Sequence, residues 1–315
     1  MLELTNRCNL DCTHCVRESP SLHHTDELTT EEWLRVLDEL ADINTFTVCF
    51  TGGEATLHPD LLLLIRYARK LNMRVALKTN GLNLSRLASP LKADGVGLID
   101  VSLYGSTAAT HERCTLVPGS FARTTAGIRA ARAEGIAVMI NISLFRWNAD
   151  ELHAIRQFAA ETGCSVNREY IMTTTDLGRT PGDICTPSQI RAIEQSWPMM
   201  TIPSHQNGST KVRFCTQGIN RMAITARGEI LSCITIREPM GHVRGEGVAA
   251  VWRRSTENGR PHNLDYDRFS RCLKCDFLPK CHVCPGHNQA ATGEFYEPPL
   301  ERCYAMMSLH GFPTA

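Results

Sequence analysis

The hydrophobic positions of this chain form short, nearly continuous apolar runs, and between these runs apolar and polar residues recur with helical spacing. Short runs rich in Val, Ile and Leu predict buried strands, and the amphipathic segments between them predict helices that cover a sheet. Six such strand–helix units follow one another over the first two thirds of the sequence. The predicted strands are residues 2–5, 45–50, 74–78, 98–103, 137–144 and 165–172.

The helices expected between these strands complete a recognisable architecture. Thr29 and Glu32 form a Thr-x-x-Glu capping box, so the first helix should begin there and run to about Ala41. Right-handed crossovers between successive parallel strands curl a sheet, and six units give an open form of the eight-unit barrel. We therefore predict an α/β fold, a partial (β/α)6 TIM-like barrel, over residues 1–200. The remaining helices are expected at residues 59–71, between the third strand and about residue 93, at 120–134, at 149–162 and from 188 onward.

The last third of the chain has a different pattern. Residues 201–211 are turn-rich and are interpreted as a linker. Beyond them, residues 221–233 predict a β-hairpin, and residues 240–255 end in a short predicted helix around Val251 and Trp252. We expect a small Cys-rich α+β domain at residues 212–305, followed by a tail at 306–315.

The composition excludes several classes of partner. Among 315 residues, 33 are Lys or Arg and 33 are Asp or Glu, so neither nucleic acid nor an anionic membrane is an expected partner. No apolar run approaches the roughly 20 residues that a membrane span requires. The few residues before Cys8 leave no room for a signal peptide. We therefore expect a cytoplasmic protein, and in that reducing compartment its 14 cysteines suit metal binding better than disulfides.

Three of the cysteines stand close together near the N-terminus. Cys8, Cys12 and Cys15 lie in the sequence CNLDCTHC, directly after the first predicted strand. Thiolates are the usual protein ligands of [4Fe-4S] clusters, and a cluster with three protein thiolates keeps one iron free to bind another ligand. The same three cysteines could instead hold zinc, which also takes sulfur ligands in a tetrahedral set.

A second motif favours the cluster. Gly52, Gly53 and Glu54 follow the second predicted strand, and glycines let a backbone approach a ligand closely because they lack a Cβ atom. Together the cysteine triad and the Gly-Gly-Glu sequence resemble the radical S-adenosylmethionine (radical SAM) family. The resemblance implies that the open iron binds the methionine part of S-adenosylmethionine (SAM) and that the Gly-Gly-Glu segment binds its amino group. It also implies that reductive cleavage of SAM gives a 5'-deoxyadenosyl radical.

Further SAM-binding residues are suggested by the same resemblance. Active sites of such barrels lie at the carboxyl ends of the strands, where the Gly-Gly-Glu segment, Asn80 and Ser102 are placed by the strand predictions. Ser102 matches the family's fourth-strand serine, which implies contact with the ribose. Asn141 on the fifth strand and Arg113 are further candidates. Arg113 can hold the SAM carboxylate through a bidentate pair or can cap local structure. No side chain is assigned as catalytic acid or base.

The C-terminal cysteines resemble the SPASM extension of radical SAM enzymes, which carries two auxiliary [4Fe-4S] clusters. The resemblance implies three clusters in total, and it leaves the fourth ligand of the first auxiliary cluster open among Cys185, another side chain, water and substrate. Only two residues separate Cys281 from Cys284, one fewer than is common in relatives. A zinc knuckle is the alternative for the paired cysteines. The implied ligands are Cys215, Cys233 and Cys284 for the first auxiliary cluster and Cys272, Cys275, Cys281 and Cys303 for the second.

The other cysteines and the histidines beside the clusters are given structural roles. Free cysteine is among the most buried residue types, so Cys49, Cys114 and Cys164 are expected in the core. His14 and His282 lie between cluster cysteines, and we expect neither to bind metal.

The resemblance also implies a function. SPASM relatives mostly modify peptides, and residues 102–124 resemble the peptide-modifying branch, so we expect a radical SAM oxidoreductase that oxidatively modifies a ribosomally made peptide or protein. Its expected partners are a precursor peptide, a separate leader-binding protein, because few residues precede Cys8, and an electron donor such as flavodoxin or ferredoxin. The alternatives are a radical SAM enzyme acting on a sugar, an aminocyclitol or a tetrapyrrole, a non-enzymatic electron carrier, and a zinc-binding interaction protein.

Overall fold

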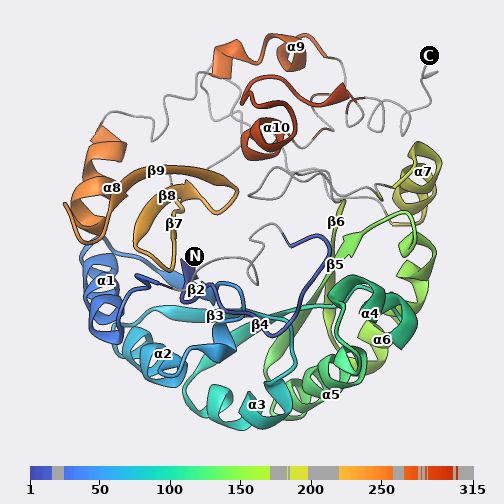
Figure 1. Ribbon diagram of the computed structural model, residues 1–315, viewed down its shortest axis with the longest axis horizontal. Coiled ribbons are helices and arrows are strands. Elements are labelled where there is room, and N and C mark those ends of the chain that lie inside the picture. The colour runs from blue at the N-terminus through green and yellow to red at the C-terminus, as the bar shows by residue number, and fades with distance from the viewer. Residues whose placement is uncertain are drawn as a thin grey trace.

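The computed structural model describes residues 1–15, 25–170, 183, 185–197, 220–257, 266–275, 278, 281, 283–300 and 303. Within these residues, nine strands form one sheet in the order β6-β5-β4-β3-β2-β1-β7-β8-β9. Figure 1 shows that the first six strands follow an arc with helices along its outer side. The sheet therefore has a convex face covered by helices and a concave face turned toward the middle of the molecule.

The first six strands are all parallel to their neighbours, as the alternation of strands and helices predicts. The α/β partial barrel is therefore confirmed. Strand β5 has the predicted limits, and the ends of the other five lie within two residues of the prediction. The six strands are β1 (Leu2–Glu3), β2 (Thr47–Thr51), β3 (Arg74–Thr79), β4 (Val96–Ser102), β5 (Ala137–Leu144) and β6 (Ser165–Tyr170).

Each strand is followed by helical structure, and the first helix begins at the predicted capping box. Thr29 Oγ1 accepts from the Glu32 amide at 3.3 Å, and the Glu32 carboxylate accepts from the Thr29 amide at 2.8 Å. No helix in the described part of the chain combines the length and the apolar character that crossing a bilayer demands. The helices of this part are α1 (Thr30–Asp42), η2 (Ala55–Leu57), α2 (Leu61–Lys70), α3 (Leu84–Ala93), α4 (Ala108–Thr115), α5 (Ser120–Ala133), η3 (Ala149–Glu151), α6 (Leu152–Thr162) and α7 (Pro187–Ser196).

The two faces of the parallel sheet differ in character. Successive side chains of a strand point to opposite faces, and Leu77, Ile99 and Ile140 on the convex side are 0% exposed. On the concave side, Lys78, Asp100 and Asn141 are polar and only partly buried, beside the apolar Ala76, Leu98 and Met139. Parallel sheets are usually covered on both faces by apolar packing. The polar residues of the concave face are therefore unusual for a parallel sheet.

The C-terminal strands extend the same sheet. Leu2 of β1 pairs in parallel with Ile224, and the next two pairings are antiparallel, which confirms the predicted hairpin. The limits predicted for the domains at 1–200, 201–211, 212–305 and 306–315 stay predictions, since residues 198–219 and 304–315 lie outside the described residues. The C-terminal elements are β7 (Ala223–Ile224), β8 (Glu229–Cys233), β9 (Ile236–His242), α8 (Val248–Glu257), η4 (Tyr266–Arg268), α9 (Ser270–Leu273) and α10 (Pro285–Thr292).

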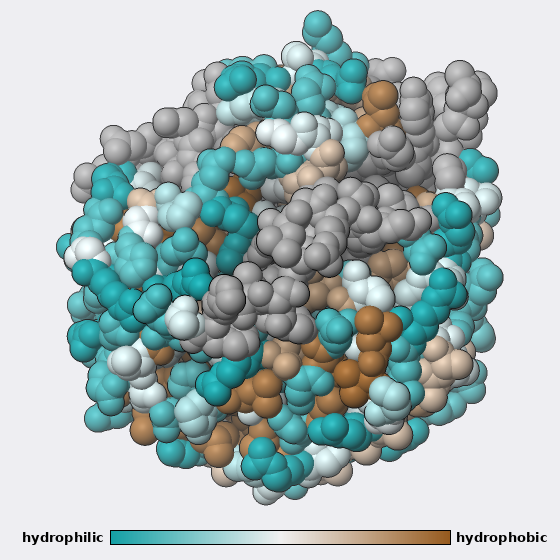
Figure 2. Space-filling view, in the orientation of Figure 1, coloured by the Kyte–Doolittle hydropathy of each residue, from teal (hydrophilic) through white to brown (hydrophobic). Residues whose placement is uncertain are grey.

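Side-chain hydropathy follows this arrangement on the face seen in Figure 2. Hydrophilic residues dominate its rim, where the outer helices lie, and apolar residues gather nearer the middle. The large core cluster lies between the strands and these helices, and Trp33, Phe50 and Leu64 in it are fully buried. Burial of this kind contributes about 25 cal/mol for each Å² of apolar surface removed from water. The core therefore stabilises the sheet that carries the strand ends.

Candidate active site and metal centres

The segment after β1 crosses the end of β2 and is held there by backbone hydrogen bonds. The Gly53 amide donates to Thr5 O at 2.8 Å, and the Glu54 amide donates to Arg7 O at 2.8 Å. A Cβ atom on Gly53 would lie 2.5 Å from Arg7 O, and one on Gly52, whose φ is +140°, would overlap Thr5 O. The close approach that these glycines permit is thus to the chain leading into Cys8, a role that the sequence prediction of ligand contact did not include.

The cysteine loop itself is fastened to α4, a helix that the sequence analysis did not predict. The Asp11 amide donates to Thr115 O at 3.1 Å, and the Thr13 amide donates to Cys114 O at 2.9 Å. The last carbonyl groups of a helix have no partner within the helix, so the loop supplies their donors. A tight turn, with the Cys15 amide donating to Cys12 O at 3.1 Å, completes the loop.

The side chain of His14 contacts neighbouring protein side chains and is not placed as a metal ligand. Its Nδ1 lies 3.1 Å from Cys114 Sγ, and its ring packs edge-on against Tyr104 and Phe145, with centroid distances of 4.7 and 5.2 Å. Burial lowers the pKa of His14 to about 4, which keeps the ring neutral. Cys114 is buried as expected, but it contacts the cysteine loop instead of the main core.

The surroundings of Cys8 and Cys12 favour a positively charged metal centre. Burial raises the pKa of Cys8 to about 11 and raises the pKa of Cys12 well above its usual range, so each thiolate needs a cation nearby. Among the described residues, no three His, Cys, Asp or Glu side chains converge as ligands of a single ion do. A [4Fe-4S] cluster binds each thiolate through a separate iron and does not require such convergence.

Glu54 links the ends of β2 and β3. Its carboxylate is 1% exposed, and one oxygen accepts from the Thr56 amide at 3.0 Å, the Thr56 hydroxyl at 2.6 Å and the Thr79 hydroxyl at 2.7 Å. The other oxygen accepts from the Asn80 amide at 2.7 Å. A buried carboxylate requires such donors in place of water. The Asn80 side chain in turn donates to Asn9 Oδ1 at 2.7 Å, within the cysteine loop.

The structure therefore brings some of the predicted SAM-binding residues together and leaves one apart. Gly52, Gly53, Glu54 and Asn80 all contact the cysteine segment or each other, and Ser102 stands beside Asn141 in the register of β4 and β5. Arg113 is 57% exposed, stacks on Trp147 at 4.9 Å and pairs with Asp183 at 3.5 Å. Among the described contacts, it makes none with the Gly-Gly-Glu segment.

The C-terminal cysteines lie in a region of tight turns. The Cys275 amide donates to Cys272 O at 3.0 Å, and the Cys281 amide donates to Leu278 O at 3.1 Å. Cys272 and Cys281 share a small apolar cluster with Phe269. Cys233 ends β8, Cys284 precedes α10, and none of the cysteines in the described residues forms a disulfide. Cys215 and His282 lie outside the described residues, so the two auxiliary ligand sets stay predictions, as does the role of Cys303.

The concave face carries a row of polar side chains, of which the sequence analysis assigned only Asn141 to the site. Lys78 Nζ lies 2.5 Å from an Asp100 carboxylate oxygen, and the Asn141 side-chain amide donates to the other oxygen of Asp100. Asn141 Oδ1 accepts from the side-chain amide of Asn167 at 2.7 Å. Lys78, Asp100 and Asn141 each interrupt a mostly apolar strand in the sequence, but their contact depends on strand pairing that the sequence does not specify.

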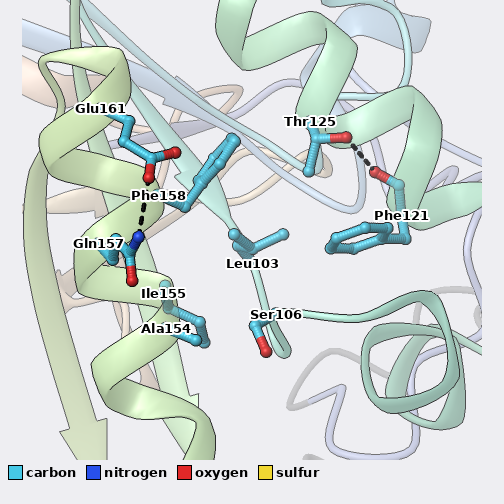
Figure 3. Close-up of a pocket in the computed structure, with 9 residues that line it drawn as sticks. All are labelled: Leu103, Ser106, Phe121, Thr125, Ala154, Ile155, Gln157, Phe158 and Glu161. Carbon is cyan, nitrogen blue, oxygen red and sulfur yellow. Dashed lines mark hydrogen bonds between the residues drawn. The ribbon is translucent and has the colours of Figure 1, made fainter.

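A cavity of about 280 Å³ lies elsewhere, between α5 and α6. In Figure 3, Phe121 and Phe158 flank Leu103, and the dashed lines mark the Gln157–Glu161 and Thr125–Phe121 hydrogen bonds of the two helices. None of the predicted SAM or metal ligands lines this cavity. It is a gap in the outer helical layer and is separate from the candidate site.

Comparison with known proteins agrees with this geometry. A model of the radical SAM superfamily matches residues 2–159. An "AdoMet-dependent heme synthase" of Methanosarcina barkeri is 27% identical over 94% of this chain and 93% of its own length. A "PqqA peptide cyclase" of Rhodopseudomonas palustris is 34% identical over 88% of this chain and 78% of its own length.

Solved structures share the fold. The structure titled "Native anSMEcpe with bound AdoMet" has a TM-score of 0.73 at 15% identity and covers 98% of this chain and 94% of its own. Streptococcus suis SuiB bound to S-adenosylmethionine has a TM-score of 0.67 at 17% identity, over 90% and 72%. The matched family model, the cysteine loop and the Gly-Gly-Glu segment packed against it establish that this chain is an enzyme of the radical SAM superfamily, which uses a [4Fe-4S] cluster and S-adenosylmethionine.

Proposed function

We propose that this radical SAM enzyme oxidises a small molecule that carries several carboxylates, of the tetrapyrrole class. The observation that carries the proposal is the polar concave face of the barrel, where Lys78 and Asp100 stand among apolar strands. The names of full-length relatives support the same class, since three are heme synthases, and an Fe-coproporphyrin III synthase matches 48% of this chain. We thus favour the small-molecule substrate that the sequence analysis gave as an alternative over the peptide substrate that it expected.

The ligands proposed for the catalytic cluster are Cys8, Cys12 and Cys15. When bound, the cluster and SAM supply hydrogen-atom abstraction from the substrate. The chain's own contribution is to hold and orient them. The backbone contacts of Gly53 and Glu54 fix the cysteine segment, and Asn80 ties it to β3.

The remaining proposed SAM contacts divide by position. Ser102, at the end of β4, is proposed to contact the ribose, and Asn141 stands beside it. Arg113, suggested by the sequence analysis for the SAM carboxylate, fits that role less well, because its guanidinium already stacks on Trp147 and pairs with Asp183.

We further propose that residues 212–305 form a SPASM domain with two auxiliary [4Fe-4S] clusters. Its ligands would be those given by the sequence analysis, with the fourth ligand of the first cluster still open. When bound, these clusters would supply an acceptor for the electron that net oxidation of the substrate releases. A carrier of the ferredoxin or flavodoxin class supplies the electron that reductive cleavage of SAM consumes.

A peptide substrate is the second candidate. The observation in its favour is the 34% identity to a PqqA peptide cyclase over 88% of the chain, a higher identity than the heme synthases reach. A precursor peptide and a separate leader-binding protein would then be partners, as the sequence analysis expects.

The experiment that separates the candidates is substrate-dependent cleavage of SAM. Anaerobically reconstituted protein is given SAM, dithionite and either Fe-coproporphyrin III or a precursor peptide encoded beside its gene, and 5'-deoxyadenosine and product mass are followed. The proposal expects Fe-coproporphyrin III to stimulate 5'-deoxyadenosine formation and to change in mass. Stimulation and mass change by the peptide alone would replace it with the second candidate. The Cys8→Ala variant, which lacks one cluster thiolate, is the control and should give neither product.

A further inference from the structure

The concave face presents cations to solvent and buries their partner anions. Lys78 on β3 is 40% exposed and its partner Asp100 is 15% exposed. Toward the other edge of the sheet, Arg237 of β9 is 32% exposed, and its partner Glu3 of β1, 3.3 Å away, is 2% exposed. In both ion pairs the positive group is the accessible one. A ligand approaching this face therefore meets positive charge first.

Lys78 is placed next to the catalytic end of the barrel. The residue after it, Thr79, donates its hydroxyl to Glu54 at 2.7 Å, and the next, Asn80, donates to Asn9 of the cysteine loop at 2.7 Å. Because Lys78 alternates with the buried Leu77 and Thr79, its side chain lies on the concave face. A group bound to its ammonium would thus lie beside the strand ends that hold the cluster loop.

The position of the ammonium is fixed by its neighbours. One carboxylate oxygen of Asp100 binds Lys78 at 2.5 Å, and the other accepts from Asn141, which Asn167 holds at 2.7 Å. A lysine ammonium has three N–H donors and Asp100 takes one of them. The row across β3 to β6 therefore orients the charge of Lys78 and leaves it donors for a second anion.

We propose that Lys78 is the substrate-anchoring residue of this enzyme and that its ammonium binds a carboxylate of the substrate, with Arg237 as the second cation of the same face. The inference rests on the proposed function, since it names the groups that would recognise a molecule with several carboxylates. Asp100 pairs with Lys78 in the absence of ligand, competes for its ammonium and does not itself touch the ligand. A charge-assisted hydrogen bond of this kind is shorter and stronger than a neutral one.

Equilibrium binding tests the inference without requiring turnover. The probe is Fe-coproporphyrin III, which carries four propionates, compared with its tetramethyl ester, and binding to the anaerobic holoenzyme is followed by the visible absorption of the porphyrin. The wild type should bind the acid at least about tenfold more tightly than the ester. Lys78→Met should lose most of that difference, and Lys78→Arg should keep it. Lys70→Met on the exposed end of α2 is the matched control and should bind like the wild type.

Asp100→Asn separates anchoring from a purely structural role. If the Lys78–Asp100 pair only stabilises the barrel, Lys78→Met and Asp100→Asn weaken binding of the acid alike. If Lys78 anchors the substrate, Asp100→Asn removes the competing anion and leaves binding unchanged or tighter. Asparagine keeps an oxygen that can accept from Asn141. Thermal melting of each variant with its cluster bound shows which variants are folded.

The outcomes also separate this inference from the proposed function. Equal binding of acid and ester by the wild type, or unchanged binding by Lys78→Met, overturns the anchor. Absence of binding to either form by the wild type overturns it too. If the wild type binds the acid through Lys78 but does not convert it, the anchor stands and the proposed reaction fails. If conversion proceeds equally well in Lys78→Met, the reaction stands and the anchor fails.

Discussion

At the scale of single residues, Glu54 is a motif side chain whose carboxylate holds neighbouring parts of the protein together. All described hydrogen bonds of its carboxylate come from residues at the ends of β2 and β3, namely Thr56, Thr79 and Asn80. The sequence motif places a carboxylate near the SAM site, but only the structure shows that its two oxygens hold neighbouring strand ends together. Any effect of Glu54 on SAM therefore acts at least partly through Asn80 and the cysteine loop.

Replacing Glu54 by Gln tests this network. The amide keeps the shape of the carboxylate but turns an N–H group toward a donor, either the Asn80 amide or the hydroxyl cluster. A buried donor without an acceptor costs about 1–3 kcal/mol, so we expect the free energy of unfolding in urea to fall by about that amount. SAM affinity, measured by calorimetry, should fall as well. Glu31→Gln on the exposed side of α1 should change neither, and an unchanged urea midpoint in Glu54→Gln would show that the network carries no stability.

At the scale of elements, α4 explains what the sequence analysis missed around the cluster. Its sequence, AATHERCT, has no wide apolar stripe, and the run was assigned to the connection between a strand and the next helix. Tertiary contacts hold this helix in place, because the carbonyls of Cys114 and Thr115 accept hydrogen bonds from the cysteine loop. Helices formed mainly by such contacts leave little periodic signal in a sequence. The regular strand–helix units were predictable because their helices carry periodic buried stripes and, in α1, a capping box.

The packing of α8 on α1 is a second contact between distant elements. Glu39 of α1 accepts from the Ala249 amide at 3.0 Å, in the first turn of α8, where unpaired amides favour a carboxylate. About two turns earlier in α1, Glu32 binds Arg244 at 2.7 and 3.0 Å. Two carboxylates of α1 thus hold the segment that follows the C-terminal strands, far away in sequence.

This contact should depend on pH in the acid range. Arg244 lowers the pKa of Glu32 from its usual 4.5 to about 2. Because the folded-state pKa is the lower one, the pair stabilises fully above about pH 4.5, and that stability is lost as the pH falls toward 2. Glu32→Gln keeps the capping box with Thr29 but removes the charge. It should lower the free energy of unfolding by at most about 1 kcal/mol at pH 7, because exposed ion pairs contribute little, and by less as the pH falls.

Urea unfolding at several pH values, with a double-mutant cycle, measures the effect. Glu32→Gln should have no further effect in an Arg244→Gln background, since the pair is already broken there. An equally large effect in both backgrounds would assign the stability to the cap alone.

At the scale of the whole molecule, the sequence predicted the barrel but not how its two parts join. Apolar runs of period two and helices of period 3.6 are local patterns, and they located all six parallel strands. The pairing of Leu2 with Ile224 joins residues more than two hundred positions apart, and no local pattern specifies it. The same limit applied to the site, since the cysteine and glycine spacing was readable, whereas the Lys78–Asp100 row required knowing which strand faces meet.

The metal content of the whole chain is the last prediction. Three [4Fe-4S] clusters correspond to about 12 irons per chain, and we expect that content, with matching sulfide, after anaerobic reconstitution. Changing Cys8, Cys12 and Cys15 together to Ala should remove only the N-terminal cluster, because the other proposed ligands lie in a separate part of the chain. That variant should hold about 8 irons and should form no 5'-deoxyadenosine.

A matched cysteine change and the wild-type iron count distinguish the competing accounts of these thiols. Cys164, at the turn between α6 and β6, is bound to Thr162 and is assigned to no cluster, so Cys164→Ala should keep the full iron content and activity. About four irons in the wild type would mean that the C-terminal cysteines hold no iron, and zinc in their place would identify the knuckle alternative. Loss of iron in Cys164→Ala equal to that in the triple variant would mean that thiol loss in general, and not the ligand set, controls cluster assembly.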